Sequence, residues 1–124
     1  MTASQLSRIA GVLGAVAVGL GAFGAHALRP LLESKGTLHT WETAVLYHFF
    51  HTLALLVLSG RPSPPRIPVI GFLLGIVLFS GSLYLLAVTG VRWLGAITPL
   101  GGVAFIAGWV CLAISRAGDG GANG

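Results

Sequence analysis

The sequence is poor in charged side chains, above all acidic ones. Its 124 residues include three acidic and seven basic side chains, so that 8% are charged, whereas about a quarter of the residues in a soluble domain carry charge. Hydrophobic residues make up 55% of the chain, and the mean hydropathy is +0.91. In water, such a composition would expose large apolar patches, which aggregate. It therefore predicts a protein embedded in lipid.

The residue patterns of common active sites are also missing. Cys111 is the only cysteine, so neither an intrachain disulfide nor a thiolate metal site can form within one protomer. The sequence has no nucleophile elbow, no paired carboxylates in an apolar segment and no histidine pair at zinc-binding spacing. GLGAFG, from Gly19 to Gly24, has the outline of a nucleotide motif, but no strand precedes it. We therefore expect no enzyme activity, metal or cofactor.

Four apolar segments are long enough to cross a bilayer as helices, because about 20 residues span its hydrocarbon layer of about 30 Å. Prolines between Ser59 and Arg66 interrupt any helix there. The short turn around Gly90 makes the last two helices antiparallel neighbours. The sequence predicts an all-α membrane protein, a single domain over residues 1–124. Its bundle of four transmembrane helices is expected at about residues 9–28, 43–59, 69–88 and 94–115.

The basic residues lie mostly at the ends of the apolar segments, where headgroups attract them. A nucleic-acid surface would cluster them on one stripe, so we expect no nucleic-acid partner. With four spans, the two termini and the second loop share one side of the membrane. That side has one more basic residue than the other, which favours N-in and C-in. The two sets are Arg8, Arg61, Arg66 and Arg116 against Arg29, Lys35 and Arg92.

The first apolar segment has a second interpretation. Arg8, the apolar stretch and Ala25-His26-Ala27 together resemble a secretory signal peptide with its cleavage site. The apolar stretch is longer than the hydrophobic region of such peptides, which favours a transmembrane helix.

Small residues at helical spacing form stripes on three of the expected helices. Such stripes let helix backbones approach closely where water supplies no hydrophobic drive. They would either pack the bundle internally or form the interface of a homo-oligomer, and the sequence favours neither. The stripes are Ala17, Gly21 and Ala25; Gly11, Ala15 and Gly19; Gly71 and Gly75; and Ala104 and Gly108.

Polar side chains of the spans gather in the membrane half next to the first and third loops. An ionisable group in hydrocarbon costs about 2.5 kcal/mol or more unless it has a partner or water. His48 and His51 lie near one face of their helix and could meet His26, with Glu42 orienting an imidazolium. For the hydroxyls, interhelical hydrogen bonding explains the pattern equally well. The candidate binding residues are His26, Glu42, His48, His51, Ser80, Ser82, Tyr84 and Thr98.

Other polar and aromatic residues have simpler interpretations. Trp41, Trp93 and Trp109 are typical of interfacial anchors. His39, in the first loop, is expected to be solvated.

Four segments resemble a known family. GAFGAHAL (21–28), WETAVLYHFFHTLALL (41–56), FSGSLYLLAVTG (79–90) and LGAITPLGG (94–102) are similar to small membrane proteins of the domain-of-unknown-function 423 family. That family includes YgdD-like and YwdK-like bacterial proteins and the eukaryotic transmembrane protein 256-like group. The resemblance implies a four-helix protein of the bacterial inner membrane and supplies no biochemical activity.

The resemblance also covers most of the candidate residues. Two positions depart from the family pattern, since other members have residues like Arg at Leu46 and Gln at His48. That departure weakens any mechanism that requires both His48 and His51. The residues that match are His26, Glu42, Thr43, Tyr47, His51, Ser80, Ser82, Tyr84, Thr98 and Pro99.

The leading hypothesis is a non-enzymatic membrane protein whose polar half binds a lipid, a small ligand or an ion, as a monomer or homo-oligomer. One alternative is a proton or small-solute channel or transporter acting as a homo-oligomer, because histidines suit proton relay. Another is an accessory subunit of a larger membrane complex. Ligation of haem is disfavoured, because histidines three apart on one helix do not face each other across an iron.

Overall fold

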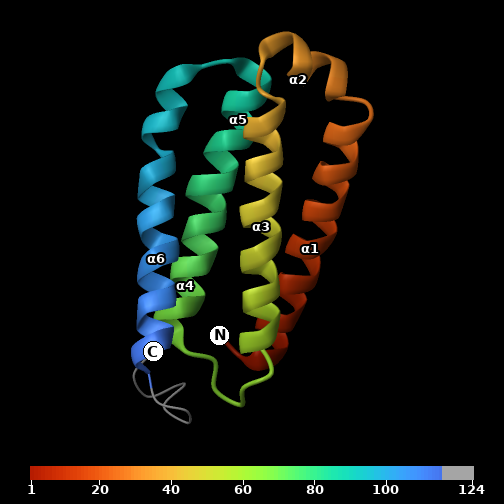
Figure 1. Ribbon diagram of the computed structural model, residues 1–124. Helices are drawn as coiled ribbons and strands as arrows, with labels where there is room; N and C mark the ends of the chain where they lie inside the picture. The colour runs from red at the N-terminus through yellow and green to blue at the C-terminus, as the bar shows by residue number, and fades with distance from the viewer. Residues whose placement is uncertain (116–124) are drawn as a thin grey trace.

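The computed structural model describes residues 1–115 and consists of helices of membrane-spanning length joined by short connections. The four long helical segments are Ala3–Ala25, Leu38–Leu58, Arg66–Thr89 and Arg92–Ile114. They run side by side (Figure 1). The expected all-α bundle of four spans is thus confirmed. Arg116, which contributes to the expected orientation, lies outside the described residues.

The first helix, α1 (Ala3–Ala25), begins about two turns before the expected start at residue 9. The Thr2 hydroxyl accepts a hydrogen bond from the Gln5 backbone N–H at 3.1 Å, and the Gln5 side chain accepts one from the Thr2 N–H at 2.9 Å. This reciprocal cap stabilises a polar first turn, which a hydropathy argument does not detect.

The second span also begins earlier than expected. It follows a short helix, α2 (Arg29–Lys35), which has Pro30 in its first turn and ends at Gly36 with a φ of 68°. The next helix, α3 (Leu38–Leu58), then starts five residues before residue 43. The Thr37 hydroxyl donates to the Ala87 carbonyl at 2.7 Å, which ties the start of α3 to the third span.

The third and fourth spans contain irregular turns. The third consists of α4 (Arg66–Gly75), a π-helical turn η1 (Ile76–Ser80) and α5 (Gly81–Thr89). The fourth begins with a 3₁₀ turn, η2 (Arg92–Ala96), and continues as α6 (Thr98–Ile114). At the end of the π-helical turn, the Ser80 hydroxyl donates to the Ala44 carbonyl of α3 at 2.8 Å, which ties the third span to the second.

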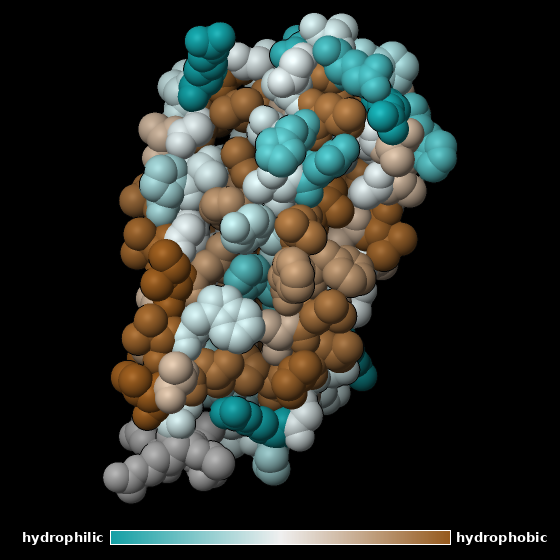
Figure 2. Space-filling model, viewed as in Figure 1, coloured by the Kyte–Doolittle hydropathy of each residue, from teal (hydrophilic) through white to brown (hydrophobic). Residues whose placement is uncertain are grey.

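The spans pack in chain order: α1 on α3, α3 on the third span, and the third span on α6. Figure 1 shows α2 and the turn before α6 at one end, which we call the first-loop end. The N-terminus and the end of α6 lie at the other, the N-terminal end. Polar colours gather at both ends in Figure 2, with an apolar band between them. The expected antiparallel pairing of the last two spans is confirmed.

The small-residue stripes divide between the inside and the outside of the bundle. A Cβ at Gly71 would meet the Ala104 carbonyl, and one at Gly75 would overlap the Phe105 ring, so these stripes pack α4 against α6. In contrast, Gly11 and Gly19 of α1 have open space where a Cβ would lie. The stripe through Gly11 and Gly19 therefore faces outward.

Candidate functional site

The predicted polar residues do not share one pocket but form separate contacts between helices. His48 is buried, and its Nδ1 lies 2.8 Å from the Tyr84 hydroxyl of α5. Its Nε2 is buried and has no hydrogen-bond partner within residues 1–115. The Tyr84 ring contacts Trp41 edge-on, with 4.9 Å between ring centroids. His48 thus links α3 to α5 close to α1.

His51 is also buried, but it faces α6 instead. Its Nδ1 is 2.7 Å from the Tyr47 carbonyl, and its Nε2 accepts a hydrogen bond from the Trp109 indole N–H at 2.9 Å. Phe105 stacks on the imidazole, with 3.6 Å between centroids. Because an indole N–H can only donate and a carbonyl can only accept, the contacts fix the neutral imidazole with its proton on Nδ1.

The hydroxyls join the remaining helices. The hydroxyl oxygens of Ser82 and Thr98 are 2.6 Å apart and share a hydrogen bond that connects α5 to α6. The Ser80 hydroxyl donates to a backbone carbonyl of α3. Each of these hydroxyls has a partner, as interhelical packing requires.

His26 and Glu42 lie apart from this group. α1 ends at Ala25, and the exposed His26 ring binds the Ala22 carbonyl of its own helix at 2.9 Å. His26 therefore does not contact His48 or His51, contrary to the expectation from the sequence. Glu42 is exposed near the start of α3.

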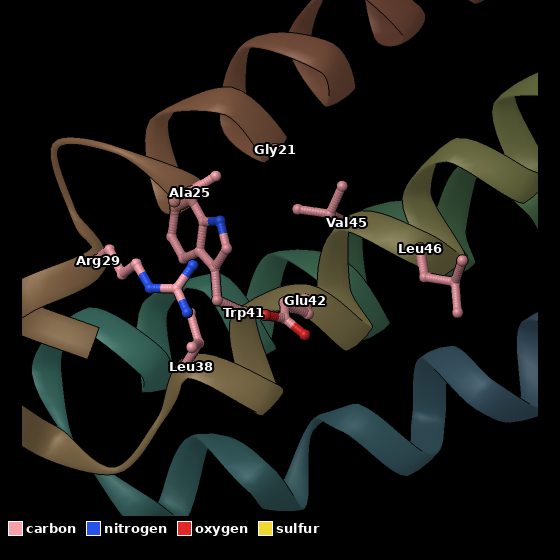
Figure 3. Close-up of a pocket in the computed structure, with 9 residues that line it drawn as sticks. Gly21, Ala25, Arg29, Leu38, Trp41, Glu42, Val45 and Leu46 are labelled. Carbon is pink, nitrogen blue, oxygen red and sulfur yellow. The ribbon is translucent and has the colours of Figure 1, made fainter. Parts of the chain in front are cut away.

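Glu42 instead lines a pocket of about 270 Å³ at the first-loop end. Figure 3 shows its walls, which come from the end of α1, the first residue of α2 and the first half of α3. The lining is mostly apolar, with one cation and one carboxylate. The lining residues are Gly21, Gly24, Ala25, Arg29, Leu38, Trp41, Glu42, Val45 and Leu46.

The wall of the pocket depends on Trp41, which differs from the exposed interfacial anchor expected from the sequence. The Trp41 side chain is buried and donates its indole N–H to the Leu20 carbonyl at 3.0 Å. A Cβ at Gly24 would overlap the indole ring. The glycine therefore leaves the room that the Trp41 ring needs between the helices. Trp109, another expected anchor, binds His51, whereas Trp93 is 67% exposed near the membrane boundary.

The charges of the pocket come from Arg29 and Glu42. The Arg29 Nε donates to Glu33 at 2.7 Å, and this contact raises the pKa of the guanidinium, with a smaller contribution in the same direction from Glu42. Arg29 therefore stays protonated. Within residues 1–115, Arg29–Glu33 is the only ion pair, so Glu42 has no cationic partner there. In the same range, no three His, Cys, Asp or Glu side chains are grouped as a metal site would need.

Sequence reasoning missed Arg29 and Trp41 as pocket residues. Pro30, which follows Arg29, and Glu33, four residues on, are typical of the start of a short helix, but they do not indicate that Arg29 lines a pocket. Figure 3 shows the Arg29 side chain directed across the pocket mouth beside Trp41 and Leu38.

Comparison with known proteins identifies the family. Residues 20–102 match the model of the family described as protein of unknown function (DUF423). The UPF0382 membrane protein YwdK of Bacillus subtilis is 50% identical over 117 residues, which cover 84% of this chain and 92% of that protein. A UPF0382 membrane protein of Staphylococcus saprophyticus is 52% identical over 112 residues, covering 86% and 92%. No solved structure matches the chain. The chain belongs to the DUF423 family, as its motifs indicated.

Proposed function

We propose that this DUF423 protein is a non-enzymatic lipid-binding protein of the bacterial inner membrane. The pocket between α1, α2 and α3 holds the headgroup of a phospholipid. The observation that carries the proposal is that Arg29 and Glu42 line the same mostly apolar pocket at the first-loop end of the bundle.

The depth of the pocket suits a headgroup. Arg29 is the first residue of α2, and Glu42 lies about 6 Å along α3 from its first residue. The headgroup layers of a bilayer add about 5–8 Å on each side of the hydrocarbon. The two charges therefore lie at the level where phosphate and polar headgroup atoms are found.

The buried contact between His48 and Tyr84 supports the Trp41 wall of this pocket. His48 binds the Tyr84 hydroxyl, and the Tyr84 ring contacts Trp41, which forms a wall of the pocket. In this account the imidazole and the phenol hold Trp41 in place, while Glu42 and Arg29 contact the ligand. Of the predicted binding residues, Glu42 is the one that takes a direct role.

The packing at the N-terminal end disfavours transport through a single chain. Leu6, Leu55 and Phe72 are fully buried in one apolar cluster there. A proton or solute path through a single chain would have to cross that cluster, which offers no hydrogen-bonding groups. A headgroup site at one end has no such requirement.

The test measures lipid phosphorus retained by protein purified in a mild detergent. Arg29→Gln and Glu42→Gln should each lose most of the bound phospholipid, because each removes one charge of the pocket. Lys35→Gln is the matched control, since Lys35 is an exposed cation of α2 that does not line the pocket. Circular dichroism melting should show all variants folded. Full retention by both pocket variants would disprove the proposal.

A further inference from the structure

A second hollow runs along the same pair of helices. It is an apolar groove of about 640 Å³ between α1 and α3. Small residues of α1 form its floor, and larger side chains of α3 form its other wall. The groove is lined by Ala10, Gly11, Gly14, Ala15, Val18, Gly19, Phe49, Thr52, Leu53 and Leu56.

The groove continues the headgroup pocket toward the bilayer centre. On α1, Val18 of the groove and Gly21 of the pocket are three residues apart, and on α3 Phe49 and Leu46 are likewise three apart. Residues at this spacing are neighbours on one helix face. One surface of the α1–α3 pair is therefore charged at its first-loop end and apolar toward the bilayer centre.

We propose that this surface binds one phospholipid whose headgroup carries a phosphate and a primary ammonium. One acyl chain lies in the groove, the phosphate binds Arg29, and the ammonium binds Glu42. This inference rests on the proposed function and specifies its ligand.

The dimensions of the groove suit an acyl chain. Along α1 the groove extends from Gly19 to Ala10, about 14 Å, which is close to half the hydrocarbon layer. Gly11 and Gly19 have open space at their Cβ positions, so no side chain fills the groove along this part of α1. Dispersion contacts with Phe49 and Leu53 would hold the chain on the opposite side.

The charges of the pocket select the headgroup. The Arg29 Nε–H donates its hydrogen bond to Glu33, and the other guanidinium N–H groups are left to bind a phosphate. Arg29 is already paired with Glu33, so an anionic headgroup without a cation of its own would leave Glu42 uncompensated in the pocket. A primary ammonium supplies the cation that Glu42 lacks among residues 1–115 and donates hydrogen bonds to its carboxylate. A quaternary ammonium has no N–H to donate.

The test is native mass spectrometry of the full chain, delipidated and then titrated with three phospholipids of identical acyl chains. We expect phosphatidylethanolamine to bind about tenfold more tightly than phosphatidylcholine or phosphatidylglycerol, a difference of about 1.4 kcal/mol. Gly19→Leu should weaken binding about tenfold, because its side chain fills the groove. Leu53→Trp fills the groove from α3 and should act alike. Glu42→Gln should remove the preference for phosphatidylethanolamine over phosphatidylcholine.

The matched control is Ala107→Leu, which places the same leucine side chain at an exposed position of α6 outside the groove. If the wild type binds lipid but both groove variants bind as well as the control, the acyl-chain site is disproved while the headgroup pocket stands. If the wild type retains no lipid, the proposed function itself fails. If the groove variants convert dimers to monomers without changing lipid binding, a second copy occupies the groove and this inference is overturned.

Discussion

The indole N–H of Trp41 donates to the Leu20 carbonyl at 3.0 Å, across the contact between α3 and α1. This bond places a large aromatic side chain between two membrane helices rather than at the interface. It satisfies the one polar atom of the ring where no water is expected. The same ring forms a wall of the pocket, so the packing of α1 on α3 and the shape of the pocket depend on one residue pair.

Gly24→Ala should destabilise the protein by about 1–3 kcal/mol, because the new methyl group overlaps the Trp41 ring. Gly19→Ala is the control: its Cβ enters open space, and alanine stabilises a helix by up to about 1 kcal/mol relative to glycine. Unfolding by SDS in mixed micelles measures both. Equal stability of the two variants would contradict the packing described for Trp41.

Trp109→Phe should cost about 1–2 kcal/mol, because it leaves the buried Nε2 of His51 without its donor. Trp93→Phe, at an exposed position, should change the free energy of unfolding by less than about 0.5 kcal/mol. The same unfolding titration compares them. A larger effect at Trp93 would mean that the indoles act as interfacial anchors instead.

His48→Gln should keep both stability, within about 1 kcal/mol, and lipid retention, because an amide can still bind the Tyr84 hydroxyl. His48→Leu, which leaves that hydroxyl unpaired, should cost about 1–3 kcal/mol. Thermal melting and retained lipid phosphorus are the two measurements. Loss of lipid in a fully stable His48→Gln variant would instead assign the imidazole to the ligand.

The orientation of the chain can be tested with single cysteines in a Cys111→Ala background. The small excess of basic residues at the N-terminal end predicts that this end is cytoplasmic. A membrane-impermeant maleimide should therefore label Ser34→Cys on intact cells and label Ser63→Cys only after permeabilisation, since both positions are exposed and neither change removes a basic residue. The reverse labelling would invert the assignment.

The four spans could be predicted from hydropathy and proline placement, but their first turns could not. The polar start of α1 depends on the Thr2–Gln5 cap, and the start of α3 on a bond from Thr37 to Ala87. Such contacts stabilise polar turns that a hydropathy pattern assigns to loops. The π-helical turn that ends at Ser80 is likewise bonded to the neighbouring helix, since the Ser80 hydroxyl donates to the Ala44 carbonyl.

The polar residues of the spans could be listed from the sequence, but neither their partners nor the depth of His51 could be predicted: His51 lies nearer the N-terminal end of the bundle than the first-loop end. Residues three apart point about 60° apart around a helix, which is enough to direct His48 to Tyr84 of α5 and His51 to Trp109 of α6. Glu42 was expected at the site, and it lines the pocket. Arg29 joins it because α2 crosses from the end of α1 toward α3 (Figure 1), an arrangement that the loop sequence alone does not specify.

Photo-cross-linking in cell membranes tests the lipid site most directly. A benzoylphenylalanine at Leu46, an exposed residue of the pocket wall, is compared with one at Val103, an exposed residue of α6 outside the pocket. If the pocket binds the proposed lipid, we expect a protein–phospholipid adduct at position 46 in clear excess over position 103. The adduct should carry a phosphatidylethanolamine headgroup. Equal adducts at the two positions, with the headgroup composition of the bulk membrane, would show only surrounding lipid and contradict the account.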